Sequence, residues 1–238
     1  MTHQSFLLLH NVSKKKNFGE LIRTAGALGV AEIIVVGAQK LASHGAHGAT
    51  GFVRFSHFDK FPDAVHYLKN VQKATLCGVE ICETAKRVQD HPFRGTTAFL
   101  MGNEGQGLTD AQMAACDQFV YIPQHSDATA SLNVNAACAV VLHHFALWAS
   151  LPEAPREGYK YKQGPPPQST PHSGMGIKQM RTLNADGSVA PRKRQAAEEG
   201  GAEEGGGDFD AGAELQLEAE AGEASEAAAA KPGGSGGS

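Results

Sequence analysis

The sequence predicts an α/β protein built on a parallel β-sheet with helices on both faces. Strand-like and helix-like segments alternate through the first 150 residues. Several of the strand-like segments are short, almost wholly apolar runs, which is typical of strands that are buried on both faces. Strands separated by helices need crossover connections, and these connections favour parallel pairing.

The first predicted elements are a strand, a helix and a second strand. Residues 6–12 form an apolar strand. A helix follows from Phe18 to about Leu28, with Asn17 as its N-cap and Glu20 placed for a capping box. Glu32–Val36 is a second, buried strand.

The remaining elements continue the alternation. A Gly/His-rich loop over residues 37–51 precedes a helix over 62–70. Thr109, with Gln112 three residues later, caps a short helix that ends at Cys116. The last elements are strands over 74–81, 97–101 and 118–122 and a long apolar helix over 132–149.

Charge and composition change near residue 151 and predict the domain organisation. Residues 1–150 carry twelve Lys and Arg against eleven Asp and Glu, and hold nearly all the periodic apolar segments. Residues 151–194 form a Pro/Gly-containing linker with a net charge of +5. Residues 195–238 form a low-complexity tail with a net charge of −10 and an Ala/Gly/Glu background. Segments of this kind bury too little apolar surface to offset their chain entropy, so residues 151–238 are expected to be mostly disordered.

Several classes are disfavoured by composition. No apolar run is long enough for a membrane span, and residues 1–4 lead almost directly into the first strand without a signal or transit pattern. The four cysteines match no CxxC pattern and are predicted to be buried small apolar residues in a reducing compartment. We therefore expect an intracellular protein, cytoplasmic or nuclear, without excluding an organelle. His44 and His47 lack partners for a metal site, so no metal is predicted.

Two turns carry the candidate functional residues. Gly102 and Gly107 follow a predicted strand. Glycines leave backbone groups open to a ligand, and α/β sheets bind their ligands at this end of their strands. Ser131 and Asn133 bring side-chain hydrogen-bonding groups to the start of the last helix. The two turns are predicted to form one pocket. A dinucleotide-binding domain is disfavoured because no Gly-x-Gly-x-x-Gly follows the first strand.

Four sequence blocks then point to a known family. The blocks are Asn17-Phe-Gly-Glu-Leu-Ile-Arg23, Met101-Gly-Asn-Glu104-Gly-Gln-Gly107, Tyr121-Ile-Pro123 and Ser131-Leu-Asn133. Over roughly residues 5–150 they resemble the SpoU/TrmH family of SPOUT-class RNA 2′-O-ribose methyltransferases, and details such as residues 143–148 most resemble a plant and algal branch. The resemblance implies a SPOUT fold with a C-terminal trefoil knot, a homodimer, and S-adenosylmethionine as cofactor.

The resemblance also implies the roles of individual residues. The cofactor-binding residues would be Met101, Gly102, Gly107, Ile122 and Leu132. The residues around the reacting ribose would be Asn17, Arg23, Glu104, Ser131 and Asn133. A guanidinium is a poor base, so we interpret Arg23 as a phosphate clamp that also stabilises developing alkoxide charge. The route of the 2′-OH proton, through the phosphate, Glu104 or water, stays open.

Each of these residues also has a purely structural interpretation. Asn17 can be a helix cap, Arg23 a solvated helix residue and Glu104 a solvated loop carboxylate. Ser131 and Asn133 can simply start the last helix. The co-occurrence of all five in family order favours the functional interpretation.

RNA is the expected partner, with no DNA and no membrane. Lys14, Lys15 and Lys16 are predicted phosphate contacts, with a solvated loop as the alternative. The predicted function is 2′-O-methylation of structured RNA, with tRNA ahead of rRNA. The alternative is a catalytically silent RNA-binding or assembly protein that retains the fold.

Overall fold

An eight-stranded sheet organises the chain, and every strand pairs with its neighbours in parallel. The strand order is β10-β3-β2-β1-β6-β4-β7-β5. The computed structural model describes residues 3–10, 15–37, 49–103, 106–164 and 180–190, all within one compact unit, Met1–Arg192. The strands are β1 (Ser5–His10), β2 (Glu32–Val36), β3 (Arg54–Phe58), β4 (Thr75–Val79), β5 (Lys86–Arg87), β6 (Thr97–Met101), β7 (Gln118–Tyr121) and β10 (Arg181–Thr182). The predicted α/β class with a parallel sheet is confirmed.

The sheet is buried on both faces because its central strands are apolar at consecutive positions. In β1, Leu7 and Leu9 face one core, while Phe6 and Leu8 face the other. The register aligns Leu9 with Val35 of β2 and with Met101 of β6. This register brings the carboxyl ends of the central strands to one edge.

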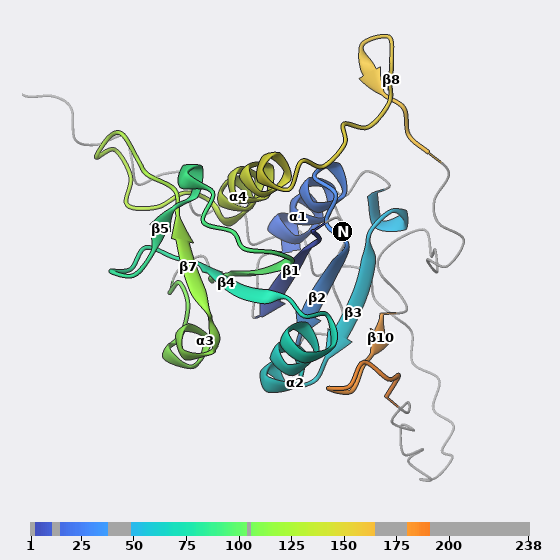
Figure 1. Ribbon diagram of the computed structural model, residues 1–238, viewed down its shortest axis with the longest axis vertical. Helices are drawn as coiled ribbons and strands as arrows, with labels where there is room; N and C mark the ends of the chain where they lie inside the picture. The colour runs from blue at the N-terminus through green and yellow to red at the C-terminus, as the bar shows by residue number, and fades with distance from the viewer. Residues whose placement is uncertain (1–2, 11–14, 38–48, 104–105, 165–179, 191–238) are drawn as a thin grey trace, which may run out of the picture. The chain divides into compact units, whose positions relative to one another are not determined.

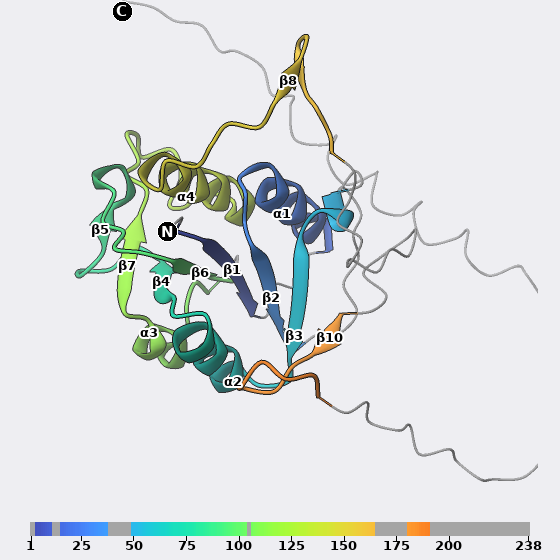
Figure 2. The ribbon, with the colours of Figure 1, turned by 45° about the vertical axis from the view of Figure 1, so that its right-hand side comes forward.

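Two layers of helices cover the sheet (Figures 1 and 2). On one face, α1 (Lys15–Ala27) and α4 (Val134–Trp148) pack side by side. On the other, α2 (Phe61–His66) continues into a π-helical turn (Tyr67–Val71), and α3 (Asp110–Ala115) lies beside it in the layer. No helix among the described residues is both long and apolar enough to span a membrane.

Helix boundaries follow the predicted caps in one case and depart from them in another. Thr109 and Gln112 form the predicted capping box, in which the Thr109 N–H donates to Gln112 Oε1 at 2.7 Å. The predicted cap at Asn17 is wrong, because α1 already begins at Lys15 and Asn17 lies inside its first turn. The long helix starts at Val134 instead of Leu132, with Asn133 as its N-cap.

Strand β3 was not predicted, because it contains polar residues that are buried in the fold and therefore does not read as an apolar run. Ser56 and His57 are both buried. The Ser56 hydroxyl donates to the Glu32 carboxylate, and His57 Nε2 lies 3.2 Å from the carbonyl oxygen of Gly37. Each partner is distant in sequence, so a local pattern does not reveal it.

The chain after α4 also contains regular structure. Strands β8 (Arg156–Glu157) and β9 (Lys160–Tyr161) form an antiparallel hairpin. Strand β10 pairs with β3 at the edge of the sheet, and Leu183 packs against the core. Residues 180–190 are therefore part of the folded unit, although this region was expected to be mostly disordered. The predicted division at residues 150 and 194 stays a prediction, and residues 195–238 lie outside the described residues.

Candidate functional site

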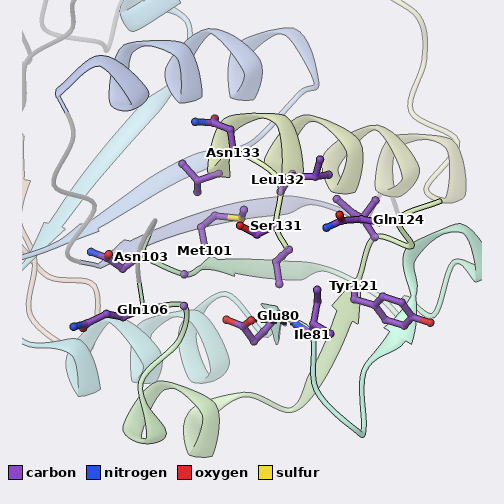
Figure 3. A pocket seen from close by; sticks show the side chains of 16 residues that line it. Glu80, Ile81, Met101, Asn103, Gln106, Tyr121, Gln124, Ser131, Leu132 and Asn133 are labelled. Atoms are coloured by element: carbon purple, nitrogen blue, oxygen red, sulfur yellow. Dashed lines mark hydrogen bonds between the residues drawn. The ribbon is translucent and has the colours of Figure 1, made fainter. Parts of the chain in front are cut away.

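A cavity of about 510 Å³ lies at the carboxyl ends of β4, β6 and β7, beside the start of α4. Crevices of this kind are where parallel α/β sheets bind ligands. Figure 3 shows Met101 and Ser131 between Glu80 on one side and Leu132 on the other. The described lining residues are Val79, Glu80, Ile81, Met101, Gly102, Asn103, Gln106, Gly107, Tyr121, Ile122, Gln124, Ser131, Leu132, Asn133, Val134 and Ala137.

One wall of the cavity is a tight turn after β6 that requires glycine at two positions. Asn103 and Gly107 exchange two backbone hydrogen bonds, each 3.0 Å long. Gly107 has φ +68°, in the left-handed region that favours glycine. A Cβ on Gly102 would lie 2.9 Å from the carbonyl carbon of Gly107. These close approaches explain why the sequence has glycine at both positions.

Glu80, which was not predicted as a site residue, joins this turn to the end of β4. Its Oε2 accepts a hydrogen bond of 2.9 Å from the backbone N–H of Leu108, and its Oε1 accepts one of 3.1 Å from the N–H of Ile81. A Cβ on Gly107 would meet Oε2 at 2.5 Å. The available signal was its position at the end of the strand predicted over residues 74–81, at the edge of the sheet where α/β proteins bind ligands.

The opposite wall is the segment that leads into α4. The Thr129 hydroxyl donates to the carbonyl oxygen of Ser131 at 2.9 Å, which fixes the backbone next to Leu132. The Asn133 side chain accepts a hydrogen bond of 2.9 Å from the Asn135 N–H and so caps the helix. Leu132 is 40% exposed, which leaves a large apolar side chain open at the cavity.

The structure brings most of the predicted site residues together. All five predicted cofactor-binding residues line the cavity, as do two of the predicted catalytic residues; these seven are Met101, Gly102, Gly107, Ile122, Leu132, Ser131 and Asn133.

The other predicted residues lie elsewhere or outside the described part. Arg23 is exposed on α1 and is not among the described cavity residues. Glu104 and Lys14 lie outside the described residues, as do the side chains of Lys15, Lys16 and Asn17, whose backbones belong to α1.

Helix α1 is nevertheless attached to the cavity wall. The Thr24 hydroxyl donates to Asn135 Oδ1 at 2.9 Å, and Asn135 Nδ2 donates to Glu20 Oε2 at 3.3 Å. Arg23 therefore lies next to a residue that is bonded to the first turn of α4. Asn135 was not predicted, because nothing local distinguishes it from other helix residues.

Three of the four cysteines are poorly suited to act as nucleophiles. Cys77 and Cys138 are buried as predicted, whereas Cys82 and Cys116 are only half-buried. Burial raises the pKa of Cys77, Cys116 and Cys138 to about 12, so these thiols stay protonated near neutral pH. Among the described residues, no group of three or more His, Cys, Asp or Glu is arranged to hold a metal ion.

The fold and cavity define a parallel α/β domain with a cavity at the carboxyl ends of its strands, the edge at which such sheets bind ligands. The family model described as the SpoU rRNA Methylase family matches residues 4–143, more than half of the chain. The chain therefore belongs to this family, and the predicted resemblance is confirmed at that level.

Two curated relatives illustrate the similarity in sequence. The chain is 33% identical over 146 residues to the 23S rRNA (guanosine-2′-O-)-methyltransferase RlmB of Acinetobacter baylyi, covering 58% of this chain and 57% of the relative. It is 29% identical over 138 residues to the tRNA (guanosine(18)-2′-O)-methyltransferase of Escherichia coli, covering 57% and 59%. The chain thus spans somewhat more than half the length of these relatives.

Two solved structures illustrate the similarity in fold. The SpoU methyltransferase AviRb from Streptomyces viridochromogenes, in complex with the cofactor AdoMet, superposes with a TM-score of 0.55 at 24% identity, over 63% of this chain and 59% of that one. The TrmH/SpoU tRNA modifying enzyme of A. aeolicus gives a TM-score of 0.53 at 21% identity, over 60% and 75%. At these identities the likeness establishes a common fold.

Proposed function

We propose that this protein is an S-adenosylmethionine-dependent methyltransferase that modifies ribose 2′-hydroxyls in structured RNA. The observation that supports this most is the convergence of three separate sequence motifs on one cavity. Gly102 and Gly107 come from the turn after β6, Ile122 from the end of β7, and Ser131 and Leu132 from the entry to α4.

The cavity suits a nucleoside cofactor in size and lining. Its volume of about 510 Å³ lies within the usual range for small-molecule sites. Met101, Ile122 and Leu132 offer apolar surface for an adenine ring, and the glycine turn offers backbone groups at close approach. Glu80, the only acidic residue among the described lining residues, complements a ligand that carries a sulfonium and an ammonium group.

The proposed chemistry is an in-line displacement in which positioning supplies much of the rate. When bound, the cofactor supplies an electrophilic methyl group. Met101, Gly102, Gly107, Ile122 and Leu132 would hold it, and the ribose would enter beside Ser131.

Arg23 is proposed to act on the RNA side of the site. A guanidinium stays protonated at neutral pH, so it clamps the adjacent phosphate and stabilises negative charge on the attacking oxygen. The hydrogen bond between Thr24 and Asn135 supports this role, because it attaches the helix of Arg23 to the cavity wall. Asn17 and Glu104 are proposed to complete the ribose site, and Lys14, Lys15 and Lys16 to contact phosphates.

The knot, the homodimer and the plant/algal branch are further proposals. The placement of β4 between β6 and β7, with α4 entering beside them, is compatible with a C-terminal trefoil knot. A dimer is supported by Leu147 on α4, which is 57% exposed in a helix whose other face is buried. Assignment to a plant and algal branch rests on the resemblance of details such as residues 129–134 and 143–148.

The test is transfer of a radiolabelled methyl group from S-adenosylmethionine to total tRNA and, separately, to rRNA. The curated relatives are divided between the two RNAs and give no support to our expectation that tRNA is preferred, so both pools are needed. We expect 2′-O-methylation of one pool, and its loss in Arg23→Ala. Arg94→Ala is the matched control, since this exposed arginine precedes β6 and lies at the opposite end of that strand from the cavity.

The silent RNA-binding alternative predicts a different result. Calorimetry with S-adenosylhomocysteine separates the two, because a silent protein that has lost the cofactor site would show no binding and no transfer to either pool. That outcome would overturn the proposed activity while leaving the family assignment intact.

A further inference from the structure

The β8–β9 hairpin lies outside the part of the chain that the family model matches, which ends at residue 143. It pairs Arg156 with Tyr161 and Glu157 with Lys160, turns at Gly158 with φ +59°, and is extended by a hydrogen bond of 2.9 Å from the Lys162 N–H to the Pro155 carbonyl oxygen. Figures 1 and 2 show it, labelled β8, as a short two-stranded ribbon.

Two aromatic side chains on this hairpin have no aromatic partner in the described part of the chain. Tyr159 is fully exposed and Tyr161 is 61% exposed. Neither ring contacts another described aromatic ring, and the hydroxyl of Tyr161 is held by Glu153 at 3.0 Å. A two-stranded hairpin without a packed face is only marginally stable in water, so it gains stability from a partner that covers it.

Basic side chains alternate with these tyrosines. Lys160 and Lys162 flank Tyr161, and neither forms an ion pair within the described residues. The nearby acids offset this charge only in part. Glu153 is already engaged by Arg156 at 3.3 Å and by Tyr161, which leaves Glu157 as the opposing charge.

We propose that the hairpin binds unpaired nucleotides of the RNA substrate, with Tyr159 and Tyr161 stacking on bases and Lys160 and Lys162 contacting phosphates. This inference rests on the proposed function for the identity of the partner as RNA. Aromatic rings interleaved with cations suit single-stranded RNA, because every base offers a face for stacking and the backbone carries negative charge. An A-form duplex hides its base faces and suits such a surface poorly.

The hairpin would supply a surface that distinguishes looped RNA from helical RNA. The family-matched region supplies the cavity, and the hairpin follows it by fewer than twenty residues. Substrate choice would then depend on residues that the family pattern does not contain.

The test measures RNA affinity by fluorescence anisotropy with the full chain. The probes are a fluorescein-labelled unstructured RNA and a blunt RNA duplex of equal length. Replacing Tyr159 and Tyr161 together by Ala should weaken binding to the unstructured RNA by about tenfold or more. Replacing both by Phe should retain affinity, because Phe keeps the stacking face. Binding to the duplex should change little in either variant.

A salt titration separates the tyrosines from the lysines. The double variant Lys160→Ala, Lys162→Ala should have a shallower slope of log affinity against log salt concentration. The slope should change by about one unit for each phosphate that a lysine neutralises in the wild type. The tyrosine variants should keep the wild-type slope. Equal affinity of wild type and the double Ala variant of the tyrosines for unstructured RNA would overturn the hairpin proposal alone. If the wild type binds neither probe nor native tRNA or rRNA, the proposed function fails as well.

A protein partner is the competing occupant. Light scattering of the tyrosine double Ala variant tests it: loss of an oligomer that the wild type forms, with RNA affinity unchanged, would assign the hairpin to self-association and overturn the proposal. Calorimetric binding of S-adenosylhomocysteine should be unaffected by all of these substitutions, which confirms that the variants are folded.

Discussion

Glu80 and Leu108 lie 28 residues apart and are joined by a hydrogen bond of 2.9 Å from the Leu108 N–H to Glu80 Oε2. The same oxygen occupies the space that a side chain at residue 107 would need. The end of β4 and the turn after β6 are thus fixed to each other by one carboxylate, and both line the cavity.

The first prediction concerns this carboxylate. Glu80→Ala should weaken binding of S-adenosylhomocysteine about tenfold, because it removes a hydrogen bond of about 1.5 kcal/mol that fixes the turn after β6, and ligand binding must then order that turn. Glu80→Gln should lose less, since its amide oxygen still accepts one bond. Calorimetry measures both, and Glu83→Ala, three residues further on and exposed, is the control. Wild-type affinity in Glu80→Ala would contradict the positioning role.

The second prediction concerns Gly107. Gly107→Ala should destabilise the protein by more than about 1 kcal/mol, since it adds a clash with Glu80 to the cost of a positive φ. Gly158→Ala is the matched control, because its φ is +59° but its surroundings are open. Urea unfolding of both variants measures the difference. In a double-mutant cycle, Glu80→Ala should remove part of the loss in unfolding free energy caused by Gly107→Ala. If the losses of the two single variants simply add in the double variant, the clash is excluded.

The third prediction concerns the attachment of the last described strand. Leu183 packs against the core, and its N–H donates to the His57 carbonyl oxygen at 2.8 Å. Leu183→Asp should lower Tm by several degrees, because it places a charge in a partly buried apolar environment. Val189→Asp, in the same segment but 56% exposed, should change the free energy of unfolding by no more than about 0.5 kcal/mol. Equal shifts in the two variants would show that residue 183 is not anchored.

The fourth prediction concerns pH. Burial, with the nearby His91 and His143, lowers the pKa of His144, and its Nδ1 lies 3.0 Å from His91 Nε2. The unfolded chain therefore binds a proton at this position more readily than the folded one. The contribution of His144 to stability is fully present above its ordinary pKa of 6.5 and is lost as pH falls below it.

Replacing His144 by Gln should flatten the dependence of Tm on pH between neutrality and mild acid. The control is His125→Gln, in an exposed loop. If both variants keep the wild-type pH profile, the histidine pair does not contribute to acid sensitivity.

Much of the core of the fold could be predicted because its signals are local. Glu32–Val36 and Thr97–Met101 are strands with the predicted bounds, since short apolar runs beside helices leave few alternatives. The need for glycine in the turn after β6 also has local causes: a Cβ on Gly102 would meet the backbone of Gly107, and Gly107 itself has a positive φ.

The parts that were missed depend on partners far away in the sequence. Strand β3 is stabilised by contacts with Glu32 and Thr182. The Thr182 hydroxyl lies 3.1 Å from Nδ1 of His57, although the two residues are 125 positions apart in the sequence. In the sequence, Glu80 looks like an ordinary exposed glutamate. Its role becomes visible only when the fold brings the Leu108 N–H within hydrogen-bond distance of it. Long-range pairing of this kind leaves no periodicity for a sequence pattern to reveal.

Strand β10 has a consequence for biosynthesis. Within the described part of the chain, the edge of β3 that faces away from β2 is paired only by residues 181–182, which are translated more than 120 residues after β3 itself. During that interval a nascent chain exposes a strand edge that neighbouring molecules can pair with. A recombinant fragment that stops at the end of α4 would keep the cavity-lining residues but leave this strand edge exposed permanently. A fragment that contains the cavity should therefore extend to residue 190.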